Sequence, residues 1–198
     1  MEKRLLFVIL CVVSYSALAE KTSLATATFA GGCFWCMEHD FDKVKGVSET
    51  VSGYIGGHKV NPTYKEVTTG KTGHTEAVRI LYNPDQVSYG QLLHIYWRSI
   101  DPTTDEGQFC DLGSQYRPEI FYHNEEQREL AERSKQELEA DKPFPHAVKV
   151  RITQADTFYP AEEYHQNFHE KNPFRYKFYR RGCGRDKRLE ALWGKKAG

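Results

Sequence analysis

Five stretches of the chain alternate between hydrophobic and polar residues or are rich in β-forming residues, and we predict that each is a β-strand. They are residues 25–30, 47–55, 74–82, 120–122 and 147–152. In the third stretch the alternation places Glu76 on the same face as Val78 and Ile80, so a carboxyl group is expected among apolar neighbours.

Helical spacing follows several of these strands. Helices are predicted over residues 34–41, 88–99 and 125–140, with Ser88 and Asn124 as N-caps of the last two. The last helix is mostly polar, which predicts a solvated face. Residues 101–118 show no period, and the aromatic, basic tail from Phe158 onward is only weakly periodic.

The resulting order of elements, β-α-β-β-α-β-α-β, mixes hairpin and crossover connections. It predicts an α+β fold: a two-layer α/β sandwich, ferredoxin-like, with a mixed sheet and a long irregular C-terminal tail. No repeat, low-complexity tract or linker interrupts the chain, so residues 20–198 are expected to form a single domain.

The first nineteen residues have the pattern of a signal peptide. Residues 1–4 are basic, residues 5–13 are apolar, and residues 17–19 form a small-residue cleavage pattern. We therefore expect an exported protein, periplasmic or secreted, with no stable membrane insertion after cleavage. An uncleaved N-terminal anchor is the alternative.

Charge excludes some classes of partner. Residues 20–198 carry 25 basic and 26 acidic side chains, and this near-neutral balance gives no electrostatic case for nucleic acid or an anionic membrane.

A cysteine pair lies where the first strand runs through Gly31 and Gly32 into a helix. Free amides at a helix N-terminus favour a thiolate, so Cys33 is expected to be nucleophilic. A buried structural pair is the main alternative for Cys33 and Cys36, and half of a zinc site is a weaker one.

Few other residues support a metal. Cys110 and Cys183 each stand alone, and His165 and His169, four residues apart, have no third ligand at a telling distance. We expect no metal.

Glu76 and two tyrosines are further candidates. Burial would raise the pKa of Glu76 and let it donate a proton near neutral pH, whereas a glutamate at the sheet edge would reach solvent or pair with Arg79 or Lys71. Tyr64 and Tyr116 lie in loops rich in glycine and polar residues and could present a phenol hydroxyl to a ligand.

Six runs, in order along the chain, together resemble the type A peptide-methionine sulfoxide reductases. They are GGCFW from Gly31, with Glu38, then GYIGG from Gly53, NPTY from Asn61, TGHTEAV from Thr72, DLGSQYR from Asp111 and AEEYHQ from Ala161. The resemblance implies reduction of the S epimer of methionine sulfoxide, in oxidised proteins or as the free amino acid. It also implies a two-layer α/β sandwich and no bound metal or organic cofactor.

The family's roles transfer to the matching positions. Cys33 would attack the sulfoxide sulfur, Phe34 and Trp35 would hold the terminal methyl group, and Glu76 would protonate the oxygen. Tyr64 and Tyr116 would bond the same oxygen, with Asp111 beside them in the loop. The resemblance further implies a sulfenic acid on Cys33 and then an intramolecular disulfide, which an external dithiol such as thioredoxin or an equivalent resets.

The thiol that resolves the sulfenic acid is left open between two residues. Cys183, between two glycines, is preferred because it lies in a flexible loop, and Cys36 is the alternative. We expect Cys110 to be a buried neighbour of the pocket.

A second function remains possible on the residues alone. An exported thiol-disulfide exchange protein would use Cys33 and Cys36 on other proteins. In either case we expect a monomer.

Overall fold

The structure, a computed structural model, describes residues 23–194. The predicted signal peptide, residues 1–19, lies outside this part. Within residues 23–194, no helix is both long enough and apolar enough to cross a membrane.

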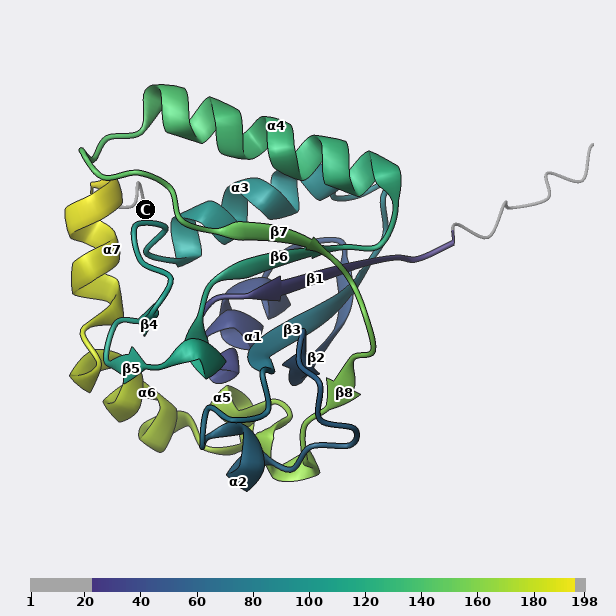
Figure 1. The fold of residues 1–198 in the computed structure, drawn as a ribbon, viewed down its shortest axis with the longest axis vertical. Helices are drawn as coiled ribbons and strands as arrows, with labels where there is room; N and C mark the ends of the chain where they lie inside the picture. Colours follow the sequence, from purple (N-terminus) through teal and green to yellow (C-terminus); the bar gives the residue numbers. More distant parts are fainter. Residues whose placement is uncertain (1–22, 195–198) are drawn as a thin grey trace, which may run out of the picture.

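A six-stranded sheet runs through the centre of the molecule (Figure 1). Its order is β7-β6-β1-β3-β2-β8; β6 and β7 are parallel and the other neighbours are antiparallel. The strands are β1 (Ala25–Ala30), β2 (Val47–Ile55), β3 (Thr75–Tyr82), β6 (Glu119–Tyr122), β7 (Arg151–Gln154) and β8 (Tyr159–Pro160). A separate small hairpin joins β4 (Gly107–Gln108) to β5 (Asp111–Leu112).

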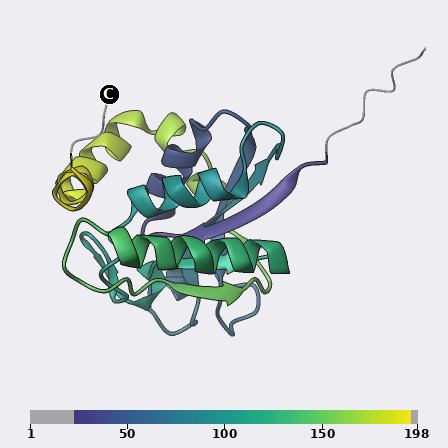
Figure 2. The same cartoon turned by 90° about the horizontal axis from the view of Figure 1, so that it is seen from above.

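Helices pack against one face of the sheet and continue around its end, as Figures 1 and 2 show. They are α1 (Phe34–Asp42), α2 (Tyr64–Val67), α3 (Tyr89–Ser99), α4 (Glu125–Asp141), α5 (Phe168–Lys171), α6 (Pro173–Gly182) and α7 (Arg185–Trp193). Two short 3-10 turns, Ser114–Tyr116 and Glu163–His165, complete the described elements. Ser88 and Asn124 cap α3 and α4 with their side chains, as predicted.

The main core lies between the sheet and this helical layer. Phe29 of β1 stacks on Phe41 of α1 and on Tyr89 and Tyr96 of α3, with ring centroids 4.9 to 5.9 Å apart. Ala131 of α4 joins the same cluster. The opposite face has a smaller cluster, which loop residues 155 and 158 cover. The mixed α/β fold with a mixed sheet is therefore confirmed, while the ferredoxin-like assignment stays a prediction.

One predicted strand starts later than its pattern indicates. Val148 and Val150 are buried as expected, but β7 begins only at Arg151. The amides before it bond elsewhere: Val148 N–H donates to Glu139 and Lys149 N–H to the Pro102 carbonyl. The alternation of hydrophobic and polar residues thus predicts which side chains are buried. The partners of the backbone amides determine where the strand starts.

The prediction of an irregular C-terminal tail is wrong. Helices α5, α6 and α7 occupy most of it, and Pro173 stands in the first turn of α6. The buried side of α6 is formed by Tyr176 and Arg180. Because the charged Arg180 occupies a buried position, the buried face of α6 does not show the run of hydrophobic residues at helical spacing that predicts a helix.

Candidate active site

The turn between β1 and α1 places Cys33 at the base of a cavity. Gly32 has φ +80°, and a Cβ there would lie 2.5 Å from Cβ of Gln108, so only glycine fits. Cys33 is the N-cap of α1 and is 6% exposed; Cys36, one turn later, is 2% exposed. Both thiols are free.

Glu76 meets this turn from β3. Its side chain is 2% exposed, and its Oε2 accepts a hydrogen bond of 3.0 Å from the backbone amide of Phe34. Burial raises the pKa of Glu76 well above its usual value, although the bond from Phe34 opposes the shift. The residue predicted from strand alternation is therefore a buried carboxylic acid beside the nucleophile, and it pairs with neither Arg79 nor Lys71 in the structure.

The Cys33 thiol differs from the sequence expectation of a stabilised thiolate. Burial raises its pKa well above the usual range, and Cys36 and Glu76 add to the shift, while a hydrogen bond with Tyr179 opposes it. The Phe34 amide at the helix N-terminus donates to Glu76. That donor therefore holds the acid in place rather than stabilising a thiolate.

Cys36 shifts in the opposite direction. A hydrogen bond from Cys33 lowers the pKa of Cys36 and outweighs its burial, and the guanidinium groups of Arg185 and Arg180 lower it further. Of the two buried thiols, Cys36 is thus the one that loses its proton more readily.

Two phenols face the same space. Tyr64 and Tyr116 line the cavity with Glu76, and burial raises the pKa of Tyr64 to about 12 and that of Tyr116 further still. Both stay protonated hydrogen-bond donors at neutral pH. Glu162 holds the Tyr64 backbone in place by accepting its amide at 2.8 Å.

Aromatic residues form the apolar wall. Trp35 stacks on Phe168 with ring centroids 3.7 Å apart, and its Nε1 donates to Nδ1 of His165 at 3.1 Å. The Phe34 ring lies 4.9 Å from the ring of His165. His165 therefore fixes Trp35, and burial lowers the pKa of His165 to about 4, so the imidazole stays a neutral acceptor.

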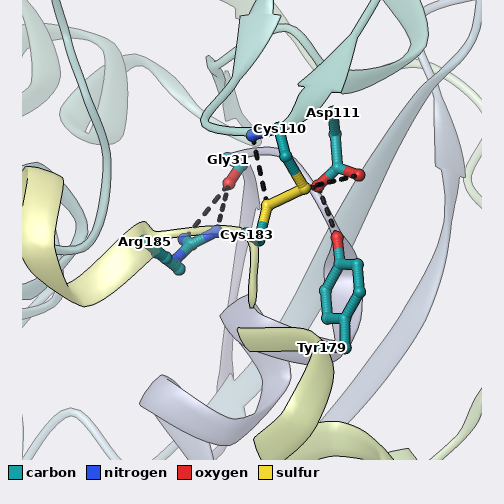
Figure 3. Close-up of a disulfide and its surroundings, with 6 residues drawn as sticks. All are labelled: Gly31, Cys110, Asp111, Tyr179, Cys183 and Arg185. Atoms are coloured by element: carbon teal, nitrogen blue, oxygen red, sulfur yellow. Dashed lines mark hydrogen bonds between the residues drawn. A yellow bond between two sulfur atoms is a disulfide. The ribbon is translucent and has the colours of Figure 1, made fainter. Parts of the chain in front are cut away.

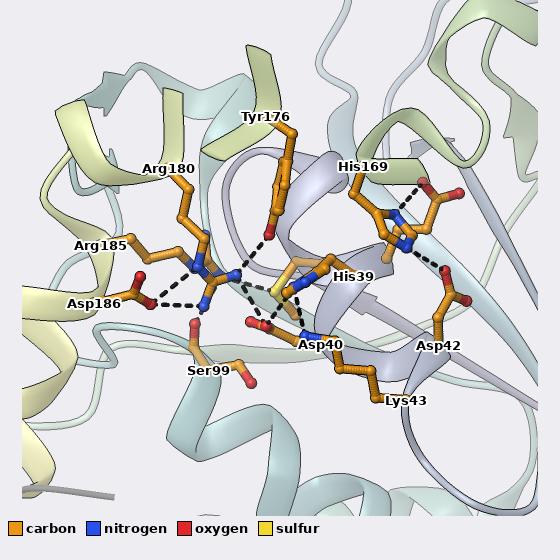
Figure 4. Close-up of polar contacts among 12 residues, drawn as sticks. His39, Asp40, Asp42, Lys43, Ser99, His169, Tyr176, Arg180, Arg185 and Asp186 are labelled. Atoms are coloured by element: carbon orange, nitrogen blue, oxygen red, sulfur yellow. Dashed lines mark hydrogen bonds and ion pairs between the residues drawn. The ribbon is translucent and has the colours of Figure 1, made fainter. Parts of the chain in front are cut away.

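The two histidines of the tail do not share a site. His165 contacts Trp35, whereas His169 lies between Glu38, at 3.8 Å, and Asp42, at 3.5 Å. Figure 4 shows the contact of His169 with Asp42. The spacing of four residues does not bring the two side chains together, because the segment between them is not one continuous helix. It is interrupted at Asn167, whose backbone is left-handed with φ 52°.

These groups enclose a cavity of about 520 Å³. Its wall consists of the predicted nucleophile, acid, phenols and aromatics together with residues of α6 and the β4–β5 hairpin, namely Cys33, Phe34, Trp35, Tyr64, Glu76, Cys110, Asp111, Tyr116, Arg175, Phe178, Tyr179, Gly182 and Cys183. Every predicted site residue except Cys36 lines it. Cys36 lies behind Cys33 in a buried cluster with Phe168 and Tyr176.

A disulfide joins Cys110 to Cys183 at the rim of the cavity (Figure 3). The prediction that Cys110 is buried is wrong, because the residue is exposed in the β4–β5 turn. Phe109 before it has a positive φ of 57°, which turns Cys110 outward. Cys183 is half-buried and caps α6, with one residue between it and the start of α7, so a junction between two helices carries it rather than the predicted flexible loop.

Tyr179 is a site residue that the sequence analysis missed. Its hydroxyl donates to Asp111 Oδ2 (Figure 3). Tyr179 is also the group whose hydrogen bond with Cys33 opposes the rise in the pKa of that thiol. Burial raises the pKa of Asp111, and the Tyr179 bond opposes that shift. The four-residue spacing of Tyr179 and Cys183 would have placed both on one helix face, had the tail been read as helical.

Two buried arginines of α6 and α7 contact the turn that carries Cys33 and the helix that follows it. Arg185 donates both terminal nitrogens to the Gly31 carbonyl at 3.2 Å, and one of them to the Ser99 carbonyl at 2.7 Å. Arg180 bonds Asp40 of α1 at 2.9 Å (Figure 4). The C-terminal helices therefore position the turn that carries Cys33.

Comparison with known proteins identifies related sequences. The family model "Peptide methionine sulfoxide reductase" matches residues 25–197. A protein of Listeria innocua named peptide methionine sulfoxide reductase MsrA is 54% identical over 87% of this chain and 98% of its own length. The MsrA of Bacillus subtilis is 51% identical over 90% of this chain and all of its own.

Solved structures agree with these relatives. Mxr1 of Saccharomyces cerevisiae in reduced form has a TM-score of 0.73 and 30% identity over 78% of this chain and 89% of that one. Methionine sulfoxide reductase A of Corynebacterium diphtheriae has a TM-score of 0.69 and 32% identity over 78% of this chain and 77% of that one. The yeast protein has also been solved in complex with Trx2, at a TM-score of 0.54 and 22% identity over 79% of this chain and 92% of that one.

Proposed function

The chain belongs to the peptide methionine sulfoxide reductase family and reduces methionine sulfoxide by thiol chemistry, and we propose that it acts on the S epimer through a sulfenic acid on Cys33. The observation that carries the proposal is the bond between the Phe34 amide and Glu76. It places a buried carboxylic acid next to the nucleophile, in one cavity with two phenol donors.

In the first step, the Cys33 sulfur attacks the sulfoxide sulfur. Glu76 gives its proton to the sulfoxide oxygen, and Tyr64 and Tyr116 bond the same oxygen as its negative charge grows. Phe34 and Trp35 hold the methyl group. The sulfoxide S–O bond breaks as the oxygen bonds to the Cys33 sulfur, and the bond between the two sulfurs breaks with its electron pair going to methionine. Cys33 is left as a sulfenic acid, and its thiol proton restores Glu76.

Because the pKa of Cys33 is raised, we propose that substrate binding itself promotes the loss of the thiol proton. By itself the thiol keeps its proton, because burial disfavours the thiolate. A bound sulfoxide brings an electron-poor sulfur to the thiol and an oxygen that accepts hydrogen bonds from the acid and the phenols. Proton loss from Cys33 is thereby coupled to substrate binding.

The second step removes the sulfenic acid. A thiol attacks the Cys33 sulfur, a disulfide forms and water leaves. We propose Cys183 as this thiol, with Cys36 as the alternative. Cys110 can then displace Cys33 from Cys183, which leaves Cys33 reduced and produces the Cys110–Cys183 disulfide that the structure contains.

An external dithiol resets the enzyme in this scheme. The exposed Cys110 gives it an accessible sulfur, whereas Cys33 and Cys36 are buried. A thioredoxin or an equivalent protein fits this requirement, and the complex of yeast Mxr1 with Trx2 supports the choice. No organic cofactor is part of the proposal.

We further propose that the substrates are oxidised proteins or free methionine sulfoxide, that the enzyme is a monomer, and that it is exported after cleavage near residue 19. Edman sequencing of the protein from a periplasmic or culture fraction tests the export. An intact Met1 there would contradict cleavage.

The decisive experiment incubates the purified protein with each epimer of dabsylated methionine sulfoxide and dithiothreitol. We expect reduction of the S epimer alone, and no activity in Cys33→Ser. Reduction of the R epimer, or none, would contradict the proposal. A general thiol-disulfide exchange protein would instead reduce insulin disulfides and leave both epimers unchanged.

A further inference from the structure

We propose that the reduced forms of Cys110 and Cys183, together with Asp111, bind a thiophilic divalent cation such as Zn²⁺ at the rim of the active-site cavity. The site is distinct from Cys33 and Cys36. It exists only while the Cys110–Cys183 disulfide is open, because a metal binds thiolates and not a disulfide. A bound cation would therefore capture the enzyme in its primed, reduced state.

The carboxylate already lies where a shared metal would need it. Asp111 Oδ1 is 3.8 Å from Cys110 Sγ, and Oδ2 is 3.9 Å from Cys183 Sγ. Zinc bonds of about 2.3 Å to sulfur and about 2.0 Å to oxygen put two tetrahedral ligands about 3.5 Å apart. A disulfide joins the two sulfurs, so after reduction both lie beside this one carboxylate and only have to separate to share one zinc ion.

Neighbouring groups satisfy the outer shell of such a site. The Tyr179 hydroxyl donates to Asp111 Oδ2, which leaves Oδ1 free for a metal and fixes the carboxylate. The Cys110 backbone amide donates to Cys183 Sγ at 3.1 Å, a bond that stabilises a thiolate (Figure 3).

Charge is compatible with a dication. Two thiolates and one carboxylate carry three negative charges, and the Arg185 guanidinium nearby contributes one positive charge. The net charge of these four groups is then −2, which a divalent cation neutralises. Binding releases the two thiol protons to the buffer and changes no oxidation state.

The location of the site allows a cation to enter from solvent, and a cation bound there would affect catalysis. Cys110 is exposed, so a metal ion can enter from solvent. All three ligands also line the cavity that contains Cys33 and Glu76. A metal there occupies the thiols that the proposed catalytic cycle needs, so it blocks turnover without touching the nucleophile.

Cobalt binding tests the site directly, without an activity assay. The protein is reduced with a phosphine, which adds no competing thiol, freed of reductant, and titrated with Co²⁺. We expect one Co²⁺ per chain, with tetrahedral ligand-field bands and a thiolate-to-cobalt charge-transfer band, and displacement of both by one equivalent of Zn²⁺. The oxidised protein should show neither band.

Variants separate this site from the Cys33 and Cys36 pair. Cys33→Ser and Cys36→Ser, made singly, should retain the cobalt spectrum, whereas Cys110→Ser should lose the charge-transfer band and Asp111→Asn should weaken binding at least tenfold. A spectrum that survives in Cys110→Ser, or disappears in Cys33→Ser, would overturn the proposal. Near-ultraviolet circular dichroism confirms that each variant is folded.

The result is independent of the proposed reaction, although the inhibition rests on it. Reduced enzyme given one equivalent of Zn²⁺ should lose more than 90% of its multiple-turnover rate with thioredoxin and regain it with a chelator, while the first turnover continues. No cobalt binding would overturn the metal site and leave the reductase proposal intact. Absence of S-epimer reduction would overturn the reductase proposal and leave the metal site intact.

Discussion

The backbone amide of Phe34 donates a hydrogen bond to the carboxyl group of Glu76 at 3.0 Å, across 42 residues of sequence. The residue that follows the nucleophile therefore positions the acid. This bond also uses an amide at the helix N-terminus that could otherwise stabilise a Cys33 thiolate. The contact therefore positions the acid and, beside the burial that raises the pKa of Cys33, leaves this amide unable to stabilise a thiolate.

Replacing the acid tests the first step. Glu76→Gln keeps the shape and can still accept the Phe34 bond, but it has no proton to give to the oxygen. We expect the single-turnover rate of sulfoxide reduction to fall by roughly 100-fold or more, the usual contribution of a general acid. Rapid-quench measurement of methionine released per enzyme checks it, with the exposed Glu49→Gln as control. An unchanged rate would remove Glu76 from the chemistry.

The protonation of Cys33 predicts how its reactivity depends on pH. A raised pKa means that the thiolate fraction grows only at alkaline pH, so iodoacetamide should label Cys33 with a midpoint above that of the unfolded protein. In Glu76→Gln this midpoint should fall, because the carboxylate that disfavours the thiolate is gone. Peptide mass spectrometry separates Cys33 from Cys36. A midpoint in the folded protein below the unfolded value would contradict the burial argument.

His165 predicts a loss of stability in acid. Its pKa of about 4 lies below the value of about 6.5 expected in the unfolded chain. Between these values the unfolded state binds more protons, so stability rises with pH and falls as pH drops from about 6.5 to 4, by up to about 3 kcal/mol.

A Gln variant measures this contribution. His165→Gln can still accept the Trp35 bond but does not titrate, so its free energy of unfolding should depend less on pH in that window. Urea unfolding at a series of pH values gives the difference, with the exposed His146→Gln as control. Parallel curves for the wild type and His165→Gln would show that His165 is not buried in its neutral form.

The order of the disulfides predicts distinct trapped species. Cys183→Ser should spare the first turnover and lower cycling with thioredoxin, and Cys110→Ser should accumulate a disulfide between Cys33 and Cys183. Non-reducing peptide mapping by mass spectrometry after one equivalent of substrate identifies the bonds. If the Cys183→Ser variant cycles with thioredoxin at the wild-type rate, or if a Cys33–Cys36 disulfide appears first, then Cys36 resolves the sulfenic acid.

Arg185 predicts that the C-terminal helix stabilises the active site. Arg185→Lys keeps the positive charge. It cannot keep all the hydrogen bonds that the two terminal guanidinium nitrogens donate to the carbonyls of Gly31 and Ser99. We expect a loss of about 2 to 4 kcal/mol in the free energy of unfolding, measured by urea denaturation. Arg181→Lys, exposed on α6, should change little. Equal stability of the two variants would argue against the support role.

The sequence by itself determined most elements of the sheet and much of the site. Strand alternation assigned Glu76 to the buried face of β3, and capping residues fixed the starts of α3 and α4, because periodicity and caps are local properties. The family motifs selected Cys33, Tyr64, Tyr116 and the aromatic wall, and all of them line one cavity.

Only the tertiary structure decided the remainder. Cys110 and Cys183, 73 residues apart, meet because the α6–α7 junction packs against the β4–β5 hairpin, and no spacing in the sequence encodes that contact. The protonation of Cys33 likewise depends on what surrounds it once the chain has folded. Burial and the competition of Glu76 for the Phe34 amide outweigh the local effect of the helix N-terminus.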